Sequence, residues 1–115
     1  MKVKITKVIT EWLTSHGLEV PEGMFVAPED ANMIEPCYLQ GVELVLLHEG
    51  CSETHAAISM DGAYQYGEGY DMYDKFVDML DGYGLHVCQI YGWASEIRVN
   101  EYYKDNLKNL IDLEI

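Results

Sequence analysis

Apolar residues recur at steps of three and four in two segments of the chain, the spacing that places them on one side of a helix. It predicts helices over Lys4–His16 and Tyr70–Asp81. The inward side of the first comprises Ile5, Val8, Ile9, Trp12, Leu13 and His16. The inward side of the second comprises Met72, Tyr73, Phe76, Val77, Met79 and Leu80. A strand over Val3–Ile9 is the competing interpretation, because Lys-Val-Lys-Ile alternates, but the helical stripe extends further.

Shorter apolar runs predict strands. Val42–His48 and Leu85–Tyr91 are apolar on both faces, as in a strand at the centre of a sheet. Thr54–Met60 and Ala63–Tyr66 are separated by Asp61-Gly62, a dipeptide typical of a two-residue hairpin turn. Two further strands are expected, at Ser95–Val99 and, as a short edge strand, at Met24–Ala27.

A last helix is expected at the C-terminal end of the sequence. Asn100 is a suitable N-cap for a helix from Glu101 to about Leu113. The resulting order, α-β-β-β-α-β-β-α, is dominated by hairpins and predicts an α+β fold. We expect a mainly antiparallel sheet of about five strands, with N-terminal, middle and C-terminal helices on one face. A chain of 115 residues has room for one core, so residues 1–115 are expected to form a single α+β domain.

The charge narrows the possible partners. The chain has 20 acidic and 7 basic residues, for a formal net charge of −13. Direct nucleic-acid binding needs a cationic surface, and the anionic leaflet of a membrane repels an acidic protein. We therefore expect no direct contact with nucleic acid or membrane. The charge steers association towards basic surfaces, which are commonest on proteins that handle nucleic acid, and it leaves the oligomeric state open.

Cysteine usage and the N-terminal sequence indicate the compartment. Met1–Ile9 lacks the apolar run of a signal peptide, and no run is long enough to span a bilayer. Cys37, Cys51 and Cys88 are an odd number at wide spacing, unlike a secreted disulfide framework. We expect a cytoplasmic protein with reduced cysteines.

The most informative charged motif lies on the predicted middle helix. Asp71, Asp74, Asp78 and Asp81 follow steps of three, four and three, so they form one stripe opposite the apolar side. Glu68 in the preceding loop and Asp61 at the hairpin tip extend this acidic patch. A row of carboxylates without cations resembles a row of phosphates, although a solvated helix face is the simpler interpretation.

Aromatic residues are concentrated near the same helix. Tyrosine suits interfaces, because its rigid apolar ring carries a polar tip. By periodicity Tyr73, Phe76 and Tyr91 are expected in the core. The tyrosines expected at the surface, as candidate partner contacts, are flanked by glycine: Tyr66, Tyr70 and Tyr83.

One short segment carries metal-ligand chemistry. His48, Cys51 and His55 could supply three ligands to a zinc ion, and His86 or Cys88 a fourth. Their spacing matches no established zinc module, so no resident cofactor is expected. Cys51 beside a histidine also has the residue types of a thiolate pair, but no third orienting group, phosphate loop or nucleophile elbow accompanies it. We therefore expect no enzymatic activity.

In size, acidity and lack of catalytic motifs the chain is similar to two groups of proteins. One comprises small phage counter-defence proteins, including anti-restriction and anti-CRISPR inhibitors that mimic nucleic acid. The other comprises cytoplasmic immunity proteins that neutralise basic nuclease toxins. The similarity implies a non-enzymatic inhibitor that occludes a basic nucleic-acid-binding groove on another protein. The alternative is a small metal- or ligand-binding domain using His48, Cys51 and His55.

Overall fold

The computed structural model describes residues 3–48, 52–59, 71–100 and 111–115. Within them it has three α-helices, a four-stranded antiparallel sheet and a separate parallel pair of strands, which confirms the expected α+β class. No helix in this part of the chain has both the length and the apolar character needed to cross a membrane.

The two helices expected from periodicity are present. α1 (Ile5–Ser15) buries Ile5, Val8, Ile9 and Leu13, and α4 (Asp71–Asp81) buries Phe76 and Leu80. α1 ends where the N–H groups of Gly17 and Leu18 donate to the carbonyls of Thr14 and Leu13. This ending needs a left-handed residue, and Gly17 has a φ of 71°.

The four-stranded sheet has the order β2-β3-β5-β4. The bounds are Phe25–Val26 for β2, Leu44–Leu47 for β3, Leu85–Tyr91 for β4 and Ala94–Val99 for β5. All neighbours are antiparallel. β2, β3 and β4 lie within segments where the sequence predicts a strand, and β5 begins one residue before its predicted segment. β3 is central, and its residues Leu44, Val45 and Leu46 are fully buried.

The strand predicted at Thr54–Met60 is wrong, because Ser52–Ile58 forms a helix, α2. Thr54, Ala57 and Ile58 are buried at steps of three and one, which is helical spacing. The two alanines also favour a helix over a strand. The predicted Asp61-Gly62 turn and the strand at Ala63–Tyr66 lie outside the described residues.

The end of the predicted last helix is also wrong. Residues 101–110 lie outside the described part, but Ile111–Asp112 form a strand, β6, that pairs in parallel with β1 (Val3–Lys4). Ile111 is buried. β1 comprises two residues of the Val3–Ile9 segment for which a strand was the alternative prediction. It is the pairing partner of β6, and the sequence of residues 101–113 by itself does not indicate this partner.

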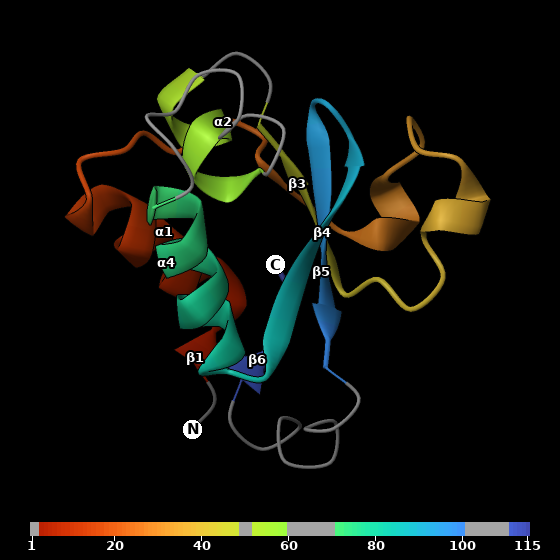
Figure 1. Ribbon diagram of the computed structural model, residues 1–115. Helices are drawn as coiled ribbons and strands as arrows, with labels where there is room; N and C mark the ends of the chain where they lie inside the picture. The colour runs from red at the N-terminus through yellow and green to blue at the C-terminus, as the bar shows by residue number, and fades with distance from the viewer. Residues whose placement is uncertain (1–2, 49–51, 60–70, 101–110) are drawn as a thin grey trace.

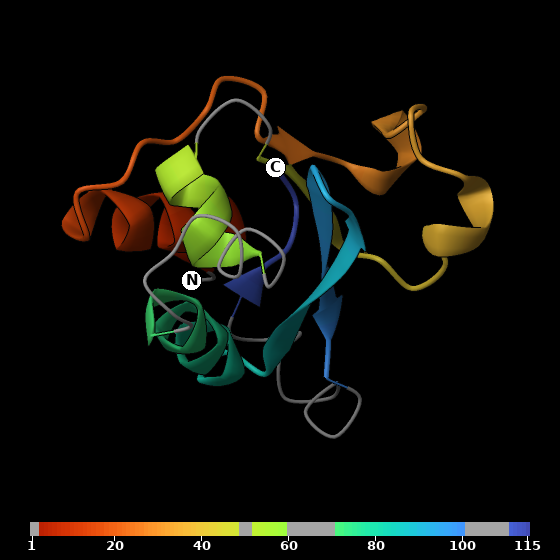
Figure 2. The ribbon, with the colours of Figure 1, turned by 45° about the horizontal axis from the view of Figure 1, so that its top comes forward.

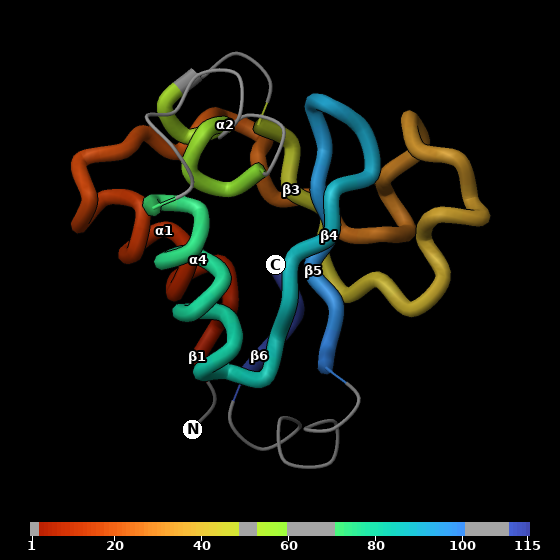
Figure 3. Tube along the Cα trace, viewed as in Figure 1, coloured from red at the N-terminus to blue at the C-terminus, as the bar shows by residue number. Residues whose placement is uncertain are grey.

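The helices lie on one face of the sheet and an irregular segment lies on the other (Figures 1 and 2). The main core joins α1, α2 and α4 to the inward residues of β3, β4 and β5, among them Leu44, Leu46, Leu85 and Ile97. On the opposite face, residues 27–43 include two single turns of 3-10 helix, η1 (Pro28–Asp30) and η2 (Pro36–Tyr38). A second, smaller core beneath them comprises Ala31, Ile34, Val42, Val45 and Ala94. The tube in Figure 3 shows the 27–43 segment projecting away from the helices.

Candidate functional site

The four aspartates of α4 are exposed in the structure. Phe76 and Leu80 hold the opposite side of the helix in the main core, which leaves this stripe in solvent. The ion pairs within the described residues are Lys7–Glu11 and Arg98–Glu96, so none involves an α4 carboxylate. Lys75, the cation on the same helix, is exposed as well. The acidic stripe is defined as Asp71, Asp74, Asp78 and Asp81, and it presents its charge to the surroundings.

The other residues of the expected contact surface are placed less favourably or lie outside the described part. Asp61, Glu68, Tyr66 and Tyr70 all fall within residues 60–70, which the structure does not describe. Tyr83 is half-buried and packs against the main core.

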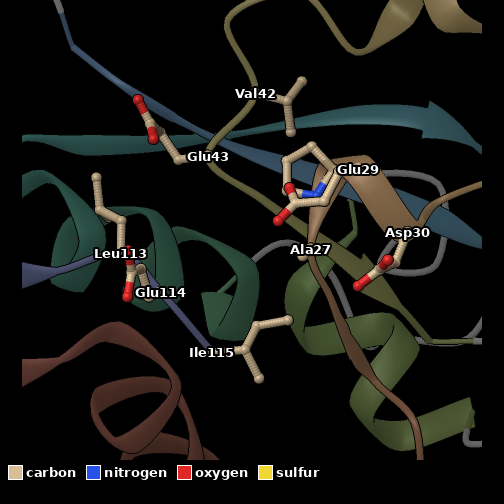
Figure 4. Close-up of a pocket in the computed structure, with 9 residues that line it drawn as sticks. Ala27, Glu29, Asp30, Val42, Glu43, Leu113, Glu114 and Ile115 are labelled. Carbon is tan, nitrogen blue, oxygen red and sulfur yellow. The ribbon is translucent and has the colours of Figure 1, made fainter.

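A second acidic surface was missed by the sequence analysis. It is a pocket of about 650 Å³ between the 27–30 turn, the two residues before β3 and the residues after β6. Its carboxylates come from these three places, and Figure 4 shows them around a common space: Glu29, Asp30, Glu43 and Glu114. Val42, Leu113 and Ile115 add apolar surface. No sequence pattern joins segments this far apart in the chain.

A row of three aromatic side chains lies on the face of the sheet opposite the helices. The Tyr38 ring meets the Tyr91 ring edge-on at a centroid distance of 5.8 Å, and Tyr91 stacks on Trp93 at 5.1 Å. Tyr38 is 48% exposed, whereas Tyr91 and Trp93 are half-buried. We call Tyr38, Tyr91 and Trp93 the aromatic row. The one sequence signal for this row is Tyr38, which lies in a segment punctuated by prolines. Neither a predicted strand nor a predicted helix explains an aromatic residue there.

Arg98 fixes the η2 segment to the sheet beneath this row. Its Nε donates to Glu96 Oε1 at 2.5 Å, and its Nη1 donates to the carbonyl of Gln40 at 2.6 Å. Its Nη2 donates to the carbonyl of Tyr38 at 3.3 Å. The hydrogen bond to Glu96 raises the pKa of Arg98, although partial burial opposes the shift. Within the described part of the chain, Glu96 Oε2 is buried and has no hydrogen-bond partner, so Arg98 is the residue that compensates this carboxylate.

Cys88 faces Glu96 across the β4–β5 ladder, and its environment makes it a poor nucleophile. Burial raises the pKa of the Cys88 thiol, and the neighbouring Glu96 carboxylate raises it further, against a smaller opposing effect of Arg98. A thiol with a raised pKa is mostly protonated at neutral pH, and the thiolate is the reactive form.

Two histidines that the sequence singled out are brought together. His48 follows β3 and is fully buried, and its Nδ1 lies 2.5 Å from Nδ1 of His55 on α2. The two rings stack at 4.6 Å, and His48 Nε2 lies 2.9 Å from Ser95 Oγ. Burial lowers the pKa of His48 to about 4, with a further contribution from His55. One proton lies between the facing nitrogens, because two N–H groups would repel and two lone pairs would have no donor.

The chemistry open to this pair is limited. Ser95, His48 and His55 have the order of a nucleophile, a base and an orienting group, but Ser95 and His48 are both fully buried. Cys51 lies outside the described residues, so the predicted three-ligand set is only partly placed. Across residues 3–48, 52–59, 71–100 and 111–115, no group of three or more potential ligands could hold a metal ion. The metal-binding alternative stays a prediction, which metal analysis of the purified protein would test.

Comparison with known proteins adds no assignment: no protein-family model, curated protein or solved structure matches the chain.

Proposed function

We propose that the protein is a non-enzymatic inhibitor that binds a basic, nucleic-acid-handling protein and occludes its nucleic-acid groove. The observation that carries the proposal is the acidic stripe, whose four carboxylates are exposed and take part in no ion pair within the described residues. Phage counter-defence and nuclease-toxin immunity are the two settings in which such an inhibitor would act.

The mechanism is stoichiometric competition. Successive carboxylates of the acidic stripe are separated by about 4.5–6 Å along the helix axis, and a nucleic-acid strand offers one phosphate per about 3.4 Å of its own axis. Lysine and arginine side chains that reach several phosphates could therefore reach several of these aspartates. The overall charge of −13 would speed the encounter with a basic surface.

The acidic pocket supports the same class of partner. Glu29, Asp30, Glu43 and Glu114 surround a space of about 650 Å³ with apolar residues beside them. A long cationic side chain has an apolar stem and a charged head, so it matches both parts of this lining. The pocket is a second place where basic side chains would be held.

The test is to neutralise the centre of the acidic stripe. A partner is captured from host lysate with the tagged protein, purified, and its affinity for the wild type and for Asp74→Asn/Asp78→Asn is measured at several salt concentrations. We expect the partner to be a basic nucleic-acid-binding protein, the double variant to bind about tenfold or more weakly, and duplex DNA to compete with binding.

The matched control is Glu19→Gln/Glu22→Gln, which changes the net charge equally at two exposed positions between α1 and β2. It should lose much less affinity than the α4 variant. Unchanged affinity of Asp74→Asn/Asp78→Asn, or binding that ignores both salt and DNA, would contradict the proposal.

A further inference from the structure

We propose that the aromatic row, Tyr38, Tyr91 and Trp93, binds an arginine-bearing segment of the basic protein partner. The inference rests on the proposed function for the class of partner, and it adds a second contact surface away from α4. It also assigns this surface a preference for arginine over lysine.

The row has the composition and exposure of a protein contact. Tyrosine and tryptophan are the residues that most often dominate binding energy at interfaces. Tyr38 is one of the few large side chains with apolar surface that are exposed in the described part of the chain, together with Val3, Met33 and Ile115. Met33 belongs to the same 27–43 segment, so two of these four exposed residues lie on this side of the sheet.

The row is held in place before any partner binds. The backbone of Tyr38 is fixed from both sides, since its N–H donates to the Glu35 carbonyl at 3.0 Å and its own carbonyl accepts from Arg98. Tyr91 pairs with Ala94 across the β4–β5 hairpin, and the carbonyl of Trp93 accepts the N–H of His48 at 3.1 Å. A surface fixed in this way loses little conformational entropy on binding.

The electrostatics select a cationic occupant. Glu35 is exposed one turn before Tyr38, and the nearby guanidinium of Arg98 is already paired with Glu96. A second copy of this chain would carry the same charge of −13 and would be repelled. Arginine fits better than lysine, because its planar guanidinium stacks on aromatic faces while donating hydrogen bonds at its edge.

The experiment compares two peptide probes of equal length and charge, oligo-arginine and oligo-lysine. Their affinities for the full chain are measured by calorimetry at two salt concentrations, with tryptophan fluorescence as a second readout. For the wild type we expect oligo-arginine to bind about threefold or more tightly than oligo-lysine. Tyr38→Ala should bring the two affinities together, whereas Tyr38→Phe, which keeps the ring, should preserve the difference.

Three outcomes would overturn the inference: equal affinities for the two peptides in the wild type, a difference that survives Tyr38→Ala, or a self-associated protein that Tyr38→Ala converts to monomer. In the last case a second copy covers the row. Asp74→Asn/Asp78→Asn separates this inference from the proposed function. This variant should lower the affinity for both peptides to the same extent. The arginine preference can therefore fail while the acidic stripe still contributes to binding, and the contribution of the stripe can fail while the arginine preference remains.

Discussion

His48 is a buried imidazole, and the folded state favours its neutral form. Desolvation and the neighbouring His55 both disfavour its protonated form. In the unfolded chain the same imidazole titrates near its ordinary pKa of 6.5. Between these two values the unfolded state binds a proton that the folded state does not. The free energy of unfolding must therefore fall as the pH falls through this window.

We expect the stability of the wild type to drop by about 2 kcal/mol between about pH 7.5 and pH 5. Urea unfolding at a series of pH values measures it, and the range stays above the titration of most carboxylates. His48→Gln should lose most of this dependence. His16→Gln, at an exposed histidine, is the control and should keep it. A wild-type stability that is flat over this range would contradict the burial argument.

At the scale of the elements, the sequence was most informative where one helix face or one strand decides the structure. α1, α4 and β3 to β5 follow from periodicity, and the acidic stripe follows from it as well, because helical spacing alone places the four aspartates together. α2 and β6 were mispredicted, since Thr54, Ala57 and Ile111 contact distant parts of the chain. The acidic pocket and the aromatic row combine separate segments in the same way, so a local pattern could indicate single members such as Tyr38 but not how the segments meet.

The η2 segment depends on one side chain of β5. Arg98→Ala would remove two hydrogen bonds to the segment and leave the Glu96 carboxylate buried without its cation. The Arg98 side chain is 30% exposed, so solvent screens its charge and the cost is smaller than for a fully buried pair. We expect a loss of about 2–3 kcal/mol in the free energy of unfolding, measured by urea denaturation.

Two comparisons test this prediction. Glu96→Leu/Arg98→Met removes both charges and should cost less than Arg98→Ala alone, because no buried ion is left unpaired. Lys7→Ala breaks the exposed Lys7–Glu11 pair and should change stability by less than about 0.5 kcal/mol. If Arg98→Ala were as mild as Lys7→Ala, the buried pair would not support the segment.

At the scale of the whole molecule, the net charge opposes folding. The charge of −13 is carried by a molecule whose largest dimension is 36 Å. The Debye length is about 30 Å at 0.01 M salt and about 8 Å at 0.15 M. At low salt most carboxylates therefore repel one another across the molecule, and at physiological salt only neighbours do.

We expect the Tm to rise by about 2–4 °C between these two concentrations of sodium chloride, measured by circular dichroism. Asp74→Asn/Asp78→Asn has a smaller net charge and should show a smaller rise. A Tm that fell with added salt would mean that attractive charge pairs outweigh the repulsion, and it would weaken the view that these carboxylates are uncompensated.

The parallel pair of β1 and β6 determines how late in translation this part of the fold can form. Val3 and Ile111 pair although more than a hundred residues separate them, and α1 begins directly after β1. On the ribosome, β1 has no partner until Ile111 has left the exit tunnel, so the main core beside Ile5 stays open at this edge until then. A nascent chain stalled before Ile111 has emerged should be cut by protease near β1. A chain extended far enough for Ile111 to leave the tunnel should resist cleavage there.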